Sequence, residues 1–284
     1  MIRILLNTIA LEPHRWTAEK IPHFRLADLL SRIAEAGFHF VEVWQYHIST
    51  EDDKAVREIK QMGDDLGVIF PVVGAYPKLH LQDQAREQEL EGFSRIVERA
   101  SLLGARTIKI FVGSKGTDEL TDDELEQSID FLSQVLKRAQ SSGLDVTGEL
   151  HKKTLFDGVE TTKGLLAKIG AGNFRICYQP YDFESTEQAI KDYTAVAESV
   201  THVHFQGRKD KKYELLQNSE IDYALLAGEV VKHGFDGYFS IEFVKDCVVS
   251  NVREFDLQAV LDNARKDKEY LGVILKQSGA QYLG

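Results

Sequence analysis

The chain repeats one pair of elements about eight times. A short run rich in β-branched and aromatic residues is followed by a segment whose apolar residues recur at helical spacing. The predicted strands begin near Ile2, Phe40, Gly67, Arg106, Asp145, Phe174, Thr201 and Tyr238. Alternating strands and helices predict a parallel sheet. Eight such units in 284 residues predict a closed (β/α)₈ TIM barrel of the α/β class.

The segments between the predicted strands have helix boundaries. RLADLLSRIAEAG, LEGFSRIVERASLLG and DELEQSIDFLSQVLKRAQSSG each end in Gly, a common helix stop. No low-complexity or Pro/Gly-rich linker divides the sequence, so we predict a single domain over residues 1–284, with a C-terminal helical segment at about 251–284. A doubly wound open sheet is the alternative. The first strand is followed by neither GxGxxG nor GxxxxGK[ST], which disfavours the nucleotide-binding forms of that sheet.

The composition of the chain disfavours some classes of binding partner. The formal net charge of −11 opposes binding to phosphate backbones and to anionic lipid surfaces. No run of about 18 apolar residues predicts a transmembrane helix, and the apolar patch at the N-terminus is too short for a signal peptide. Cys177 and Cys247 do not form a disulfide framework. We therefore predict a cytoplasmic protein that binds neither nucleic acid nor membrane.

Several predicted strands carry polar residues on the face that is not expected to meet the helices. In VTGELHKKT, starting at Val146, apolar residues alternate with Glu149 and His151. The same alternation predicts inward side chains at Glu42, Trp44, Lys109, Gln179, His202, His204, Gln206, Arg208, Ser240 and Glu242. It predicts that Phe243 faces the helices. A polar barrel interior is costly unless its groups are paired or bind a metal.

Four of these polar residues end consecutive strands. Catalytic groups of such barrels converge at the carboxyl ends of the strands, so Glu149, Gln179, His204 and Glu242 are expected to meet. Two carboxylates, an imidazole and an amide suit one divalent cation, and Mn²⁺, Co²⁺ or Zn²⁺ fit better than Mg²⁺. The alternatives are a buried Glu149–His151 ion pair, a hydrogen-bonded core histidine at position 204 and an ordinary polar lining at Gln179.

Four motifs resemble those of the xylose isomerase-like TIM-barrel superfamily: ELHKKT, QPYD, HVHFQGRKD and SIE. This superfamily includes ketose 3-epimerases, inosose isomerases and dehydratases, hydroxypyruvate isomerase and endonuclease IV, and the resemblance covers nearly the whole chain. It implies a metal bound by Glu149, Gln179, His204 and Glu242. The superfamily usually has Asp, followed three residues later by His, where this chain has Gln179 and Asp182, and an amide ligand should weaken metal binding.

The resemblance implies an isomerase or epimerase that acts next to the carbonyl of a sugar or polyol. A metal that polarises the carbonyl would stabilise an enediolate, while Glu149 and Glu242 would remove and return the proton. The residues predicted to contact the substrate are His151, Asp182, Arg208, Lys109 and Trp44. Lys109 has an equally supported alternative, which is to neutralise Glu42 or Glu149.

Other functions stay open at this point. A lyase of the same superfamily would use the same metal and base to dehydrate an inosose or 3-dehydroshikimate. A metal-free polyol-binding barrel is the alternative that Gln179 suggests. An endonuclease would need several zinc ions and more inward His and Asp residues, and the negative charge opposes it. The expected partner is a small molecule, and a homo-oligomer is an open alternative.

Overall fold

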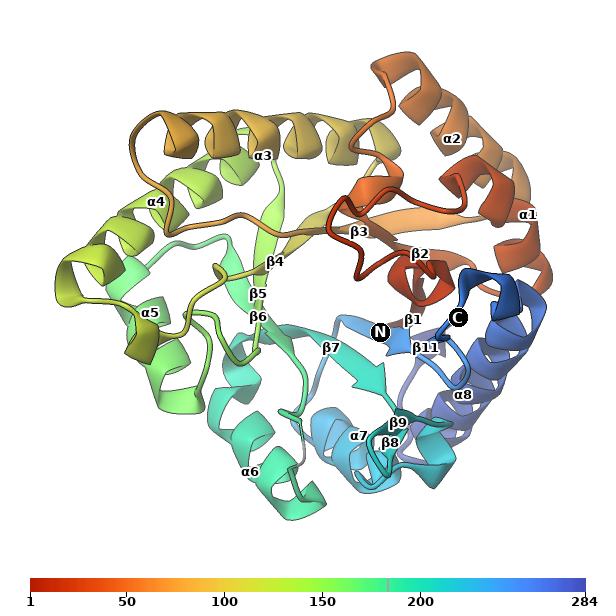
Figure 1. Ribbon diagram of the computed structural model, residues 1–284. Coiled ribbons are helices and arrows are strands. Elements are labelled where there is room, and N and C mark those ends of the chain that lie inside the picture. The colour runs from red at the N-terminus through yellow and green to blue at the C-terminus, as the bar shows by residue number, and fades with distance from the viewer. Residues whose placement is uncertain (183) are drawn as a thin grey trace.

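The protein forms a closed barrel of eight parallel strands in a computed structural model that describes residues 1–182 and 184–284 (Figure 1). The strands are β1 (Ile2–Asn7), β2 (Phe40–Trp44), β3 (Ile69–Ala75), β4 (Thr107–Phe111), β5 (Asp145–Glu149), β6 (Phe174–Tyr178), β7 (Val200–Gln206) and β10 (Tyr238–Phe243). The barrel closes where β1 pairs with β10, from Arg3 opposite Tyr238 to Leu6 opposite Ile241. The predicted (β/α)₈ fold is confirmed, and the open sheet is excluded.

Within the described residues, eight α-helices surround the strands (Figure 1). They are α1 (Leu26–Glu35), α2 (Asp53–Leu66), α3 (Asp83–Leu103), α4 (Asp122–Ser141), α5 (Val159–Ile169), α6 (Thr186–Val196), α7 (Tyr223–Lys232) and α8 (Leu257–Gln277). Sequence signals set several of their ends. Thr121 caps α4 in a capping box with Glu124, and α3 ends at Gly104, whose φ of +79° is in the left-handed region.

The hydrophobic core lies between the strands and the helices. The outward residues of the strands are fully buried there, for example Ile108, Val146 and Phe205. Gly148 belongs to the same outer face of β5, where a Cβ atom would lie 2.5 Å from the ring of Phe156. The absence of a side chain at Gly148 therefore allows Phe156 to pack directly against the strand.

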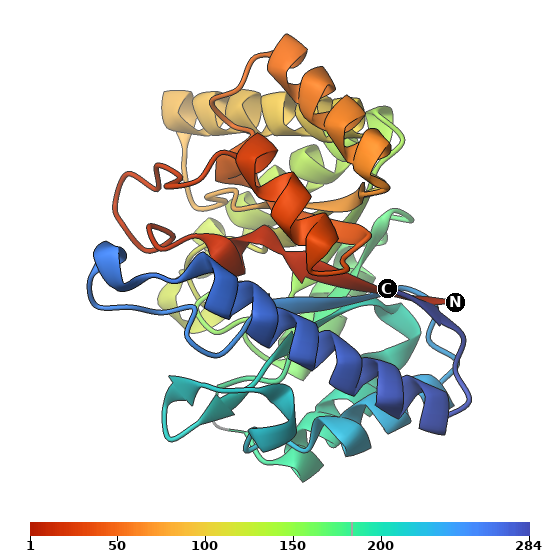
Figure 2. The same ribbon diagram turned by 90° about the vertical axis from the view of Figure 1, so that its right-hand side faces the viewer.

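Several short elements were not predicted from the sequence. After β7, an antiparallel hairpin is formed by β8 (Arg208–Lys209) and β9 (Lys212–Tyr213). A last strand, β11 (Tyr282–Leu283), pairs with the start of β1 after α8, so the two chain ends lie side by side (Figure 2). The 3₁₀ turns are η1 (Thr8–Leu11), η2 (Gln45–His47), η3 (Thr117–Glu119), η4 (Ala197–Ser199), η5 (Leu216–Asn218) and η6 (Val252–Glu254). Across the described parts of the chain, none of the helices combines the length and the apolar character needed to cross a bilayer.

Candidate active site

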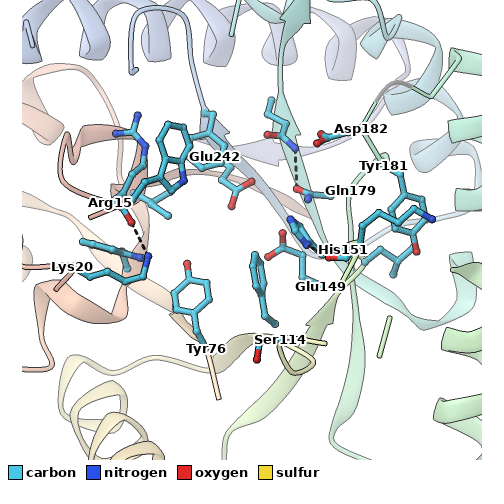
Figure 3. A pocket seen from close by; sticks show the side chains of 18 of the residues that line it. Arg15, Lys20, Tyr76, Ser114, Glu149, His151, Gln179, Tyr181, Asp182 and Glu242 are labelled. Carbon is cyan, nitrogen blue, oxygen red and sulfur yellow. Dashed lines mark hydrogen bonds between the residues drawn. The ribbon is translucent and has the colours of Figure 1, made fainter. Parts of the chain in front are cut away.

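A cavity of about 480 Å³ opens at the carboxyl ends of the barrel strands (Figure 3). Strand ends form its floor, and the loops that follow β1, β5 and β6 form much of its wall. Seven of the nine predicted site residues line it: Trp44, Glu149, His151, Gln179, Asp182, Arg208 and Glu242. The other two, Lys109 and His204, are fully buried beside its floor and contact Glu149 and Glu242.

Glu149 ends β5 and is only 1% exposed. Its Oε2 accepts a hydrogen bond of 2.7 Å from the ammonium of Lys109 on the neighbouring strand β4. Its Oε1 has no hydrogen-bond partner within the described ranges. One carboxylate oxygen is therefore held in place, while the other is buried and unsatisfied.

Lys109 lies in the barrel interior with its Nζ 5.0 Å from the ring centres of both Tyr76 and Phe111. Burial opposes the charge of this ammonium, but Glu149 together with the more distant Tyr76, Glu42 and Glu242 outweighs burial and holds the pKa of Lys109 well above its usual range. Of the two carboxylates that the sequence offered as partners, Glu149 is the one that forms the ion pair. Contact of Lys109 with a substrate stays a prediction.

His204 on β7 is held between the carboxylates of three strands. Its Nε2 lies 3.1 Å from Oε2 of Glu42, and its Nδ1 lies 3.4 Å from Glu242 Oε2 and 3.9 Å from Glu149 Oε1. Burial opposes the charged form of His204, but nearby acidic groups, the Cys177 thiol and Glu42 foremost, outweigh burial and hold the pKa of this imidazole well above its usual range. A proton on Nδ1 therefore faces the other two carboxylates unless a cation replaces it. A carboxylate behind a histidine is the usual way to orient a metal-binding imidazole.

Glu42 organises a second buried layer beneath His204. Its Oε2 accepts a hydrogen bond of 2.6 Å from Ser240 and lies 3.2 Å from Nε2 of His202. Burial would raise the pKa of Glu42, but His204 and His202 outweigh it and keep that pKa well below its usual range. Glu42 is therefore an ionised carboxylate, with His204 and Ser240 hydrogen-bonded to one oxygen and the ring of His202 close to it.

Glu242 lies at an irregularity in β10. The register with β7 shifts between Ile241, opposite Phe205, and Phe243, opposite Gln206, so Glu242 is the extra residue of a β-bulge. The bulge breaks the strict alternation, and both Glu242 and Phe243 line the cavity. The prediction that Phe243 faces the helices is wrong for this reason. Burial opposes ionisation of Glu242, but His204 outweighs it and lowers its pKa.

Three of the predicted ligands fit a divalent cation. One ligand atom from each of Glu149, His204 and Glu242 lies within 4.8 Å of the others, and all three residues are buried. Both Glu149 Oε1 and His204 Nδ1 lack a hydrogen-bond partner within residues 1–182 and 184–284. Unsatisfied buried donors and acceptors of this kind are costly, and a cation would satisfy them.

The fourth predicted ligand, Gln179, follows β6 and also lines the cavity. Its side-chain oxygen accepts a hydrogen bond of 3.3 Å from Gln206. Figure 3 shows Gln179 on the same side of the cavity as Glu149 and His151. Its place is compatible with either a ligand or a polar lining residue, so its ligand role stays a prediction.

The residues predicted to contact a substrate are placed around the mouth. His151 stacks on Phe111 with ring centres 4.5 Å apart. Arg208 forms a 2.8 Å ion pair with Asp182 and donates a 3.0 Å hydrogen bond to the hydroxyl of Tyr213. Trp44 is 2% exposed and packs on Tyr46, with ring centres 4.7 Å apart. These positions are consistent with contact to a ligand but do not test it.

The wall formed by the β1–α1 loop was missed in the sequence. Arg15, Trp16 and Lys20 line the cavity from this loop. The buried Glu12 fixes the loop, because its carboxylate accepts hydrogen bonds from the backbone N–H groups of His14 at 2.8 Å and His23 at 2.7 Å. The available signal was the charged and aromatic run EPHRW directly after the first strand, since loops at the carboxyl ends of barrel strands build active sites.

The fold and the buried Glu–His–Glu cluster define the class of protein: a TIM barrel with a site suited to one divalent metal ion. Residues 30–270 match the family model described as xylose isomerase-like TIM barrel, and the chain belongs to this family. The structural expectation from the four motifs is therefore confirmed at the level of the family.

Similar proteins fall into two activity classes. Over 191 residues, 66% of this chain and 68% of the relative, the chain is 21% identical to 3-dehydroshikimate dehydratase from Bacillus anthracis. The structure of a probable 3-dehydroshikimate dehydratase of the same species superposes with a TM-score of 0.70 at 17% identity, covering 91% of this chain and 97% of that one. An L-ribulose 3-epimerase superposes with a TM-score of 0.76 at 17% identity, covering 98% and 96%. Structural similarity at such low identity shows the fold alone.

Proposed function

We propose that the protein is a metal-dependent isomerase or epimerase that moves a proton next to the carbonyl of a sugar or polyol. The observation that carries this proposal is the placement of Glu149 and Glu242, which line one cavity from strands β5 and β10 with His204 between them. Two carboxylates around a bound carbonyl compound are what proton removal and proton return require.

Glu149, His204 and Glu242 would hold the metal ion, with Gln179 as the proposed fourth ligand. A divalent cation at this site supplies positive charge that stabilises the enediolate form of the substrate. The donor set favours Mn²⁺, Co²⁺ or Zn²⁺ over Mg²⁺.

The protein's own residues would carry the proton. One of the two carboxylates removes the proton from the carbon next to the carbonyl, and the electron pair of the C–H bond moves into the enediolate. Return of a proton to the opposite face of the same carbon gives an epimer, and return to the neighbouring carbon gives an isomer. Lys109 fixes Oε2 of Glu149 in this scheme. Trp44 and His151 would form the cavity surfaces against which the substrate packs.

A dehydratase is the second candidate, favoured by the match to 3-dehydroshikimate dehydratase. The first step would be the same proton removal. The enediolate would then expel a β-hydroxyl, which leaves as water after it takes up the proton that the carboxylate removed in the first step. The two candidates therefore share the proton removal and differ in the fate of the enediolate.

The test combines metal analysis with substrate screening in D₂O. We expect the purified protein to contain about one divalent metal per chain. Ketoses should acquire deuterium next to the carbonyl, whereas 3-dehydroshikimate should yield no aromatic product. Glu149→Gln should lower turnover at least about a thousandfold while the fold is retained, in line with the loss of a general base. Glu160→Gln, an 84% exposed glutamate on α5, is the matched control.

Three results would change the assignment. An aromatic product from 3-dehydroshikimate, lost in Glu149→Gln, would favour the dehydratase. Protein that retains no metal and turns over no ketose, inosose or dehydroshikimate would favour a metal-free polyol-binding barrel. Full activity of Glu149→Gln would remove this residue from the mechanism.

A further inference from the structure

The β1–α1 wall of the cavity carries two cations that have no carboxylate partner. Arg15 is 2% exposed, and its guanidinium donates to the backbone carbonyls of Glu12 and Cys247. Its Nε has no partner, and neither Arg15 nor Lys20 forms an ion pair within 4.0 Å in the part of the chain that the structure describes. Lys20 is half-buried, and the one acceptor of its ammonium among the described residues is the carbonyl oxygen of Arg15, at 2.9 Å.

This arrangement is costly for a protein that contains no ligand. Carbonyl groups satisfy donors but do not neutralise a charge, and burial of an unneutralised cation is unfavourable. Burial lowers the pKa of Lys20, which shows the penalty on its charged form. Lys20 also has a φ of +50°, the left-handed region that non-glycine residues seldom adopt and that often marks a functional site.

The charges of the other cations at the cavity are either paired with a carboxylate or exposed to solvent. Lys109 is paired with Glu149, and Arg208 is paired with Asp182. Lys78 and Lys152 line the cavity as exposed residues, so water solvates their charges. Arg15 packs between the rings of Trp16 and Phe243, 4.8 and 5.6 Å from their centres. These aromatic contacts fix its position and leave its net charge in place.

The two cations lie across the cavity from the proposed reaction centre. Figure 3 shows Arg15 and Lys20 on one side, with Glu149, His151 and Gln179 on the other and Tyr76 between the two sides. A ligand whose carbonyl end lies at Glu149 and Glu242 would therefore extend its far end toward Arg15 and Lys20. A negative charge at that end would supply the missing partner.

We propose that Arg15 and Lys20 form a subsite for the anionic group of the ligand, a carboxylate or a phosphate, so that the protein prefers polyhydroxy acids or sugar phosphates to neutral sugars. The inference rests on the proposed function for the location of the reacting end. The subsite itself is a matter of binding, and it can be tested without turnover.

The experiment compares three five-carbon ligands that differ in one terminal group: ribitol, D-ribonate and D-ribitol 5-phosphate. Isothermal titration of the full-length, Mn²⁺-saturated protein gives the three dissociation constants. We expect at least one anionic ligand to bind about tenfold or more tightly than ribitol, the factor expected for a hydrogen-bonded charge pair. The tighter of the two anions identifies carboxylate or phosphate as the group recognised. Equal affinities for all three ligands would overturn the subsite.

Variants show whether the preference comes from this wall. Lys20→Met should reduce the anion preference to about threefold or less, through weaker binding of the anion. Lys78→Met, which removes an exposed lysine from the same cavity, is the matched control and should retain the preference. Arg15→Met should act like Lys20→Met, with circular dichroism to verify the fold. A preference that survives in Lys20→Met and in folded Arg15→Met would mean that the anion binds at the metal, and the proposal would be wrong.

Failure of the subsite and failure of the proposed function give different results. An anion preference that depends on Lys20, without turnover of any substrate, would keep the subsite and remove the isomerase. Turnover of neutral ketoses that is lost in Glu149→Gln, without anion preference, would keep the isomerase and remove the subsite.

Discussion

The charged side chains at the floor of the cavity and those of its β1–α1 wall differ in whether they have partners of opposite charge. On the floor, Lys109 faces Glu149 at 2.7 Å, and His204 lies 3.1 Å from Glu42 and 3.4 Å from Glu242. On the wall, Arg15 donates to backbone carbonyls and packs on Trp16, Lys20 donates to a backbone carbonyl, and neither has a carboxylate partner in the described part of the chain. The charges of the floor are therefore paired with one another, whereas those of the wall would be neutralised by a bound anion.

The largest loss of stability is expected when Glu42 is removed from the charged network at the floor. Glu42→Ala would leave His204 and Ser240 without their shared acceptor and His202 without the adjacent negative charge. Removal of one partner from a buried charged network costs about 3–5 kcal/mol of unfolding free energy. Urea denaturation of metal-free protein at pH 7 measures the loss. Glu58→Ala on α2, where the side chain is 63% exposed, is the control and should change stability by less than about 0.5 kcal/mol. A loss below about 1 kcal/mol in Glu42→Ala would show that the floor is not a coupled unit.

A buried carboxylate outside the barrel provides a second test of how burial affects an unpaired charge. Asp267 on α8 is 1% exposed, and its Oδ1 accepts a 2.8 Å hydrogen bond from the Leu216 backbone, while its Oδ2 has no partner among the described residues. Burial raises the pKa of Asp267 to about 7. A raised folded-state pKa contributes stability that is fully present below the unfolded value and is lost as the pH rises toward 7.

Asp267→Asn should therefore stabilise the protein at pH 8, by about 2–4 kcal/mol, and have almost no effect at pH 3.5. The amide keeps the acceptor for Leu216 and removes the charge that burial disfavours. Urea denaturation of both proteins at the two pH values measures the difference. An equal change in unfolding free energy at both pH values would mean that Asp267 is not held neutral by its surroundings.

The smallest loss of stability is expected when the hydrogen bonds that hold the β1–α1 loop are weakened. Glu12→Gln would weaken the charge-assisted hydrogen bonds from the backbone N–H groups of His14, His23 and Phe24, which should cost about 1–2 kcal/mol. Amide exchange of these three groups should accelerate, because the opening of the loop becomes easier. Glu19→Gln, an exposed glutamate of the same loop, is the control. Unchanged exchange in Glu12→Gln would show that the wall does not depend on this carboxylate.

The floor was predictable from the sequence, while the wall was not. Glu42, Lys109, Glu149 and His204 were found because strand residues alternate with a fixed period, so the apolar phase determines the polar one. Arg15 and Lys20 lie on an irregular loop, where no period relates a residue to the side that it faces. Their placement depends on the hydrogen bonds of Glu12, which join residues up to 12 positions apart.

The alternation also fails where a strand is irregular. The bulge in β10 brings Glu242 and Phe243 to the same cavity, although strict alternation separates them. The β8–β9 hairpin places Arg208 and Tyr213 at the mouth, and no turn signal in QGRKDKK predicted it. Sequence periodicity therefore describes the regular part of the barrel, and the family resemblance supplies the rest of the predicted site.

Gly148 links the outside of the barrel to the chemistry inside it. Phe156 occupies the space that a side chain at position 148 would fill, and its carbonyl accepts hydrogen bonds from the backbone N–H of His151 at 3.2 Å and the hydroxyl of Tyr181 at 2.9 Å. A methyl group added at position 148 would displace the ring of Phe156 and, through it, His151 and Tyr181, which line the cavity. Redesign of the substrate range can thus begin behind the barrel wall, at a position on the far side of the strand from any ligand.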